Sequence, residues 1–157
     1  MRKGFTMIEL IFVIVILGIL AAVAIPRLAA TRDDAEISKA ATNLSTVVSD
    51  VTAYYTSKTN FNSDMKKMTN VSLNIGTGDT FAGTLQVKGK DCIKITAVEP
   101  TAANVAYVQV TEVKTNADAL CGVLAQVPAV EKMLTAEDAN ITGEKGVYPV
   151  GGSNVVY

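Results

Sequence analysis

Glu9 is the residue of this chain that most clearly calls for a chemical explanation. It is the only ionisable side chain between Met7 and Ile25, and no polar side chain follows it from Leu10 to Ile25. A carboxylate in a lipid-facing segment is costly, so such groups tend to have a partner and a function. The α-amino group of a neighbouring copy would complete the pair. We therefore predict Glu9 to be an assembly residue; the alternative is an interfacial side chain that reaches into water.

The basic residues Arg2 and Lys3 before the apolar run suggest two ways to process the N-terminus. An ordinary signal peptide would be cut after the Ala-Val-Ala of residues 22–24. Three features argue against it: Glu9 lies in the basic-to-apolar transition, Pro26 follows the cut closely, and the helical pattern continues beyond it.

The second cleavage site lies before the apolar run, between Gly4 and Phe5. Glycine leaves the scissile bond free of a side chain, and a short basic leader of residues 1–4 would stay in the cytoplasm. Phe5 would become the new N-terminus. Glu9 would then have no cationic side chain within a turn or two of its own helix.

These residues resemble a known family. The sequence GFTMIEL, followed by IFVIVILGILAAVAIP and an amphipathic helix, is similar to the N-terminus of type IV pilins, a family that includes the pseudopilins of type II secretion. The residue-by-residue resemblance covers Arg2 to about Leu28.

The resemblance implies a role for each matching residue. A prepilin peptidase would cut after Gly4 and methylate Phe5, and Glu9 would help to recruit the next subunit. Gly18 and Pro26 match positions where the helix loosens in assembled filaments. Close helix packing is the alternative for Gly18. Pro26 is expected to kink or open the helix in either case, because proline lacks the N–H.

Cys92 and Cys121 are the chain's two cysteines. An even pair in an exported domain predicts a disulfide, since such domains fold in oxidising compartments. The alternative is two buried reduced thiols.

The elements that position these residues begin with one long helix. Residues 5–28 would span about 36 Å, enough for a bilayer core of ~30 Å. From Ile37 to Tyr55 apolar residues recur every three or four positions, which predicts an amphipathic helix to about Ser57 that packs on a sheet rather than in a free coiled coil.

Short apolar segments separated by turns follow this helix, which predicts an antiparallel meander. The fold class is therefore α+β, with a leader (1–4), a transmembrane and assembly helix half (5–28) and a periplasmic or extracellular globular domain (29–157). The expected elements after the first helix are a short helix at 63–68, strands at 80–88, 92–98 and 105–113, helical segments at 117–125 and 128–134, and a last strand or hairpin at 147–157.

The composition argues against several classes of function. The chain has no histidine, so it cannot form a Ser-His-Asp or Cys-His catalytic site. It also has no phosphate-binding glycine loop, and we expect no enzyme activity. Its formal net charge of −1 gives no reason to expect strong nucleic-acid binding. No metal or other cofactor is expected, apart from one weak calcium candidate.

That candidate is the stretch from Asp138 to Glu144. Oxygen-bearing side chains at alternate positions resemble half of a calcium loop, but the distal acidic ligand is missing. Two other interpretations compete with it. Asn140-Ile-Thr142 is a glycan acceptor sequence, and the stretch can be a plain polar loop with a helix starting at Thr135. The calcium ligands would be Asp138, Asn140, Thr142 and Glu144.

The sequence thus favours a type IV pilus subunit for adhesion, motility or DNA uptake. The cysteine pair carries this preference, because many pilins close a C-terminal loop with a disulfide and major pseudopilins usually lack it. A type II secretion pseudopilin is the alternative, which bound calcium would favour. A membrane-anchored binding module is a second alternative.

The resemblance also implies partners and a location. The partners are other copies in a helical filament, the prepilin peptidase, an assembly platform and a separate ATPase. The chain would first lie in the bacterial inner membrane as a single-pass protein with a cytoplasmic N-terminus. It would later join an extracellular pilus or a periplasmic pseudopilus.

Overall fold

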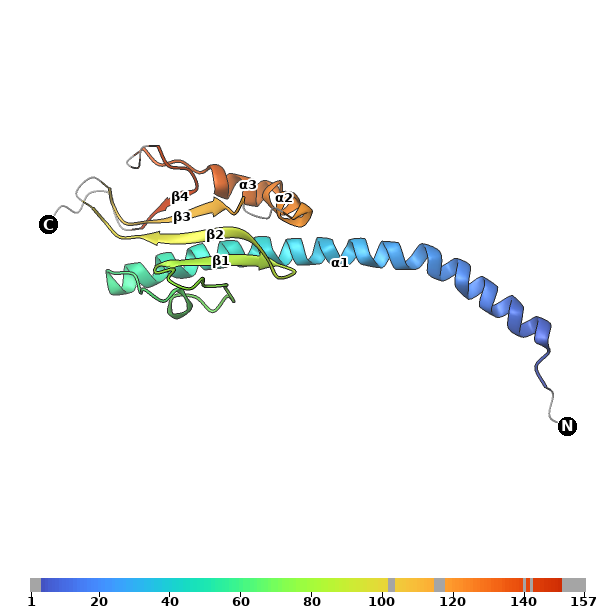
Figure 1. Ribbon diagram of the computed structural model, residues 1–157. Helices are drawn as coiled ribbons and strands as arrows, with labels where there is room; N and C mark the ends of the chain where they lie inside the picture. The colour runs from blue at the N-terminus through green and yellow to red at the C-terminus, as the bar shows by residue number, and fades with distance from the viewer. Residues whose placement is uncertain (1–3, 102–103, 115–117, 140, 142, 151–157) are drawn as a thin grey trace. The chain divides into compact units, whose positions relative to one another are not determined.

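The computed structural model describes residues 4–101, 104–114, 118–139, 141 and 143–150. The chain divides into two units, residues 1–35 and 36–157. The long helix α1 (Met7–Lys58) contributes to both. All the other elements belong to the second unit (Figure 1).

The second unit contains an antiparallel sheet of four strands in the order β1-β2-β3-β4 (Figure 1). The strands are β1 (Ala82–Val87), β2 (Lys90–Val98), β3 (Tyr107–Glu112) and β4 (Val147–Pro149). Between β3 and β4 the chain forms α2 (Ala119–Ala125) and α3 (Pro128–Thr135), and a single 3₁₀ turn, Met65–Lys67, precedes β1. The predicted α+β arrangement, a long helix packed on a small antiparallel sheet, is confirmed.

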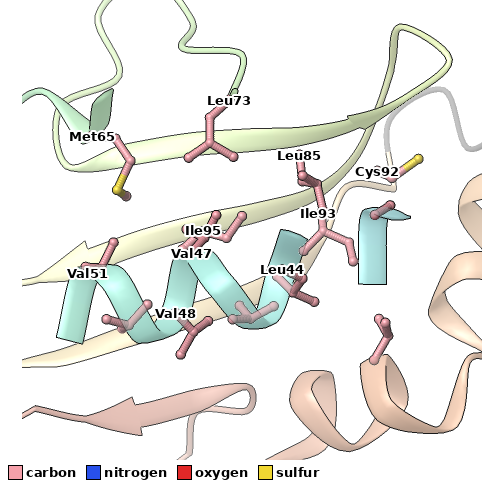
Figure 2. Close-up of a cluster of buried hydrophobic side chains, with 14 of the residues drawn as sticks. Leu44, Val47, Val48, Val51, Met65, Leu73, Leu85, Cys92, Ile93 and Ile95 are labelled. Atoms are coloured by element: carbon pink, nitrogen blue, oxygen red, sulfur yellow. The ribbon is translucent and has the colours of Figure 1, made fainter. Parts of the chain in front are cut away.

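The core lies between the sheet and the second half of α1. Leu44, Val47 and Val51 of α1 are fully buried, as are Ile95 of β2 and Val108 of β3. Figure 2 shows the α1 side chains lying against those of β1 and β2. This is the apolar stripe that the sequence predicts, with its three- and four-residue spacing intact.

Threonine hydroxyl groups on the polar side of the same helix form hydrogen bonds with the helix backbone. Thr42, Thr46, Thr52 and Thr56 each donate a hydrogen bond to the carbonyl oxygen four residues earlier, at 2.7–3.0 Å. Back-bonding of this kind is a common way to place threonine inside a helix.

The segment between α1 and β1 packs into the core rather than lying on the surface. Phe61, Met65 and Leu73 are buried in the main cluster. At Gly83 of β1 a β-carbon would come within 2.9 Å of the Leu73 side chain, so a larger residue there would have to displace Leu73, and glycine lets the segment approach closely. The segment also pairs with β1, because Asn74 and Thr84 exchange both backbone hydrogen bonds at 2.8–2.9 Å.

The sequence-based boundaries need several corrections. The helix expected at 63–68 is only the three-residue 3₁₀ turn. Strands β1 and β3 are shorter than expected at both ends, and β2 begins two residues earlier than expected. Thr135 ends α3 instead of starting a helix, and its hydroxyl donates to the Glu131 carbonyl oxygen. Of the strand expected at 147–157, the structure has Val147–Pro149 as β4, and residues 151–157 lie outside the described residues.

Candidate functional site

The N-terminal site begins with a hydrogen-bonded turn at the start of α1. The backbone N–H of Thr6 donates to Glu9 Oε2 at 2.9 Å, and the Thr6 hydroxyl donates to the same oxygen at 2.6 Å. The backbone N–H of Glu9 lies 3.4 Å from the Thr6 hydroxyl oxygen. This is a capping box, in which the residue before the helix and the third helical residue satisfy each other's polar groups.

The capping box gives Glu9 a partner within its own chain. The absence of a nearby cation predicted no partner for Glu9 in its own helix, whereas the structure shows this neutral one. The signal was present, since Thr-Met-Ile-Glu is the Thr-x-x-Glu pattern of a capping box. Both Thr6 donors use Oε2, and Oε1 accepts no hydrogen bond from any residue that the structure describes.

Gly4 and Phe5 lie immediately before the helix. Both are exposed, Phe5 to 85%, and no heavy atom lies within 4 Å of a β-carbon built on Gly4. The peptide bond between them is therefore in an open, non-helical stretch. Arg2 and Lys3 lie outside the described residues.

The apolar run that follows Glu9 is not covered by any part of the chain that the structure describes. Every residue from Leu10 to Ile25 is exposed, and the helix contains a window of mean hydropathy 3.1. By length and composition this helix is able to cross a membrane. Gly18 lies within this exposed run, with open space where a side chain would be. A run of this kind needs lipid or other protein around it.

Pro26 does not interrupt α1. The helix is continuous from Met7 to Lys58 and includes Pro26, and a kink or loosening of the helix there stays a prediction. A proline removes one helical hydrogen bond, and the turns on each side keep theirs.

The predicted disulfide is present in the second unit. Cys92 of β2 and Cys121 of α2 are bonded, with their Cα atoms 5.0 Å apart. Both are buried, and Val113 N–H donates to the Cys92 carbonyl oxygen. The bond joins α2 to the sheet.

The weak calcium candidate is a compact turn in the described residues. Asp138 and Ile141 form an isolated bridge, and a carboxylate oxygen of Glu144 accepts a hydrogen bond from Gln109 Nε2 at 2.6 Å. Glu137 and Lys145 form an ion pair at 3.7 Å. Across the described ranges no three acidic, cysteine or histidine side chains come together as a metal site. The other two candidate ligands, Asn140 and Thr142, lie outside those ranges.

Comparison with known proteins identifies the N-terminal site. Residues 1–25 match a family model described as the prokaryotic N-terminal methylation motif. No curated protein and no solved structure matches the chain significantly. The matched region contains Gly4, Phe5, the Thr6–Glu9 capping box and Gly18, and it ends just before Pro26. The chain therefore carries a prepilin-type N-terminus, the N-terminus of type IV pilins and pseudopilins.

Proposed function

We propose that this chain is the structural subunit of a type IV pilus. Residues 1–4 would be removed by prepilin peptidase, which would also methylate the amine of Phe5. The observation that carries the proposal is the matched methylation motif followed by an apolar helix segment, residues 10–25, that no described residue covers. The exposed, non-helical Gly4–Phe5 bond supports it, because a peptidase needs an extended and accessible substrate.

Assembly would exchange lipid for protein around the apolar helix. The processed chain waits in the inner membrane with residues 10–25 in lipid, and is then extracted into a bundle of identical helices. Helix association in lipid gains nothing from the hydrophobic effect, so packing and polar pairs must direct it. An assembly platform and a separate ATPase supply the work, because the sequence has no phosphate-binding glycine loop.

Glu9 would guide each incoming copy. Its Oε2 is held by Thr6, and its Oε1, which accepts no hydrogen bond from the described residues, would accept one from the Phe5 amine of a neighbour. The capping box thus holds the carboxylate in place while one oxygen remains available. An ionised donor and acceptor in a medium of low dielectric form a strong pair.

The disulfide favours a pilus over a secretion pseudopilus. It closes a loop with a sequence separation of 29 residues in the C-terminal part of the chain. Loops closed in this way are common among pilins and unusual among major pseudopilins. A fibre exposed outside the cell also needs subunits that resist unfolding, and a disulfide provides this.

The location and mass of the mature chain test this proposal. We expect mass spectrometry of material sheared from the cell surface to find an abundant chain that begins at N-methylated Phe5 and is two mass units light for the disulfide. The same mature chain confined to the membrane fraction would indicate a pseudopilin. A chain that keeps residues 1–4 everywhere would contradict both and leave a membrane-anchored binding module.

The role of Glu9 has its own test. We expect a Glu9→Ala chain to be processed normally but to give no sheared filaments. The matched control is Glu112→Ala, which removes another exposed carboxylate, at the end of β3, and should assemble. Normal filaments from Glu9→Ala would overturn the assigned role.

A further inference from the structure

Two opposite charges stand exposed on α1 just beyond the apolar run. Arg27 follows Pro26 directly, and Asp34 comes two helical turns later. Neither side chain makes an ion pair or hydrogen bond with any other residue in the described part of the chain. Their neighbour Asp33, by contrast, is half-buried and has an interaction.

The two charges share one face of the helix. A separation of about seven residues is close to two full turns, so Arg27 and Asp34 point in nearly the same direction about 10.5 Å apart. Between them on this face lie Ala30 and Thr31, which are small. The Thr31 hydroxyl donates to the Leu28 carbonyl oxygen at 3.0 Å, so it is satisfied within the helix. Nothing large on this face obstructs a neighbouring helix.

The same spacing prevents the two charges from pairing within one chain. Helical side chains lean toward the N-terminus, so the Arg27 side chain leans away from Asp34. A second, parallel copy displaced along its axis shortens the axial gap between the two charges. We infer that Arg27 of one copy pairs with Asp34 of a neighbouring copy, an inference that rests on the proposed function as a filament subunit.

The Glu9 pairing proposed above fixes a displacement that suits this second pair. If Glu9 of one copy meets the Phe5 amine of the next, the helices are offset by about four residues, or ~6 Å. The Arg27 backbone of the second copy is then level with residue 31 of the first, about 4.5 Å short of Asp34. An arginine side chain spans that distance. Displacement in the opposite direction would separate the pair by about 16 Å.

The chemistry suits a contact at the outer end of a membrane span. Arginine forms paired, directional hydrogen bonds with a carboxylate, which fix geometry as well as charge. Where water is partly excluded, the attraction is stronger than on an open surface. Each pair would also repeat at every subunit along the filament. The Arg27–Asp34 pair thus sets the axial register at one end of the apolar run, and Glu9 sets it at the other.

Charge exchange tests the pair directly. We expect Arg27→Asp and Asp34→Arg each to lower the yield of sheared filaments at least about tenfold, because each places like charges together. The double variant should restore the yield to within about twofold of the parent chain. All three variants should be processed normally, since both residues are exposed. A double variant as poor as the single ones would overturn the inference and point to another partner, such as a lipid phosphate for Arg27.

Arg32→Asp is the matched control. It makes the same change of charge on the same helix, about 140° around from Arg27. It should assemble like the parent chain. A loss as large as that of Arg27→Asp would mean that net charge matters rather than this face, and would overturn the inference.

A crosslink separates this inference from the proposed function. In an Arg27→Lys chain in its native membrane, carbodiimide should join position 27 of one copy to Asp34 of another, and Asp34→Asn should abolish the link. A crosslink without surface filaments would support the pair and contradict the pilus. Filaments without the crosslink would support the pilus and contradict the pair.

Discussion

Thr6 and Glu9 form a polar unit at the edge of an apolar run. Burying an ionised carboxylate without hydrogen bonds is expensive, and the capping box supplies two donors to Oε2. One of these bonds satisfies the N–H of Thr6, and the Thr6 hydroxyl oxygen in turn accepts from the N–H of Glu9 in the first helical turn. Thr6 therefore stabilises both the helix start and the charge.

Substitution of Thr6 tests this dual role. Thr6→Ala removes the hydroxyl, so we expect the first turn of α1 to lose about 0.5–2 kcal/mol. Thr6→Ser keeps the hydroxyl and should behave like the parent. Amide hydrogen exchange of residues 7–10 in detergent micelles measures the difference. Equal exchange in the Ala and Ser variants would show that the hydroxyl contributes nothing.

Gly146 is a position where the backbone permits no other residue. Its φ is +68°, and a β-carbon there would collide with the Val110 carbonyl oxygen. We expect Gly146→Ala to cost on the order of 1–3 kcal/mol of unfolding free energy. The measurement is urea denaturation of the detergent-solubilised chain followed by tyrosine fluorescence.

Gly122 provides the opposite case in the same measurement. It lies inside α2 with open space where a β-carbon would be added, so Gly122→Ala should stabilise the chain by about 0.5–1 kcal/mol. If both alanine variants changed stability in the same direction, the assigned causes would be wrong.

The helices and strands differ in how far local sequence predicts them. The buried stripe of α1 and the strands have clear periodic patterns, and the turn at Lys88-Gly89 separates β1 from β2. The local sequence is therefore sufficient to predict that these helices and strands exist. The burial of Met65 and Leu73 depends on contacts with distant strands, which no local pattern reveals. For the same reason the sequence missed the smaller cluster around Tyr107 and Ile141.

The N-terminal site was predictable for a different reason. Gly4, Phe5 and Glu9 lie close together in sequence, and their types are unusual for a membrane segment, so a linear pattern was sufficient. The calcium candidate stays a prediction, because two of its four ligands, Asn140 and Thr142, lie outside the described residues. In the structure Glu144 accepts a hydrogen bond from Gln109, a residue far away in the sequence.

The disulfide should be the main covalent restraint on α2. Replacing Cys92 and Cys121 together by serine should lower the unfolding free energy by about 3–4 kcal/mol, because the unfolded chain regains the freedom of a long loop. The same denaturation series measures it, with the reduced parent chain as the matched control. A loss below about 1 kcal/mol in both samples would contradict this account.

The two units have different sources of stability. The core that includes Leu44, Ile95 and Leu124 lies wholly within residues 36–157, whereas the described residues before Ile37 are exposed or half-buried. The second unit therefore does not need the apolar run in order to fold. The apolar run, in turn, depends on lipid or neighbouring copies.

A truncated chain checks this division. Residues 36–157, exported to an oxidising compartment, should be soluble without detergent and monomeric, with one cooperative unfolding transition. Sedimentation and denaturation measure both properties. A loose, aggregating product would show that the helix before residue 36 supports the core.

The two outermost strands of the sheet, β1 and β4, have edges that are protected against pairing with strands of other chains. A sheet edge with free N–H and C=O groups invites another chain to add a strand, and crowding in a membrane increases that hazard. Here Asn74 occupies both backbone groups of Thr84 along β1. On β4, Val147 donates to the Ala136 carbonyl oxygen, and Pro149 has no N–H to offer. Strand-to-strand aggregation is thereby discouraged, and under the proposed function the helices would be left as the surface through which copies meet.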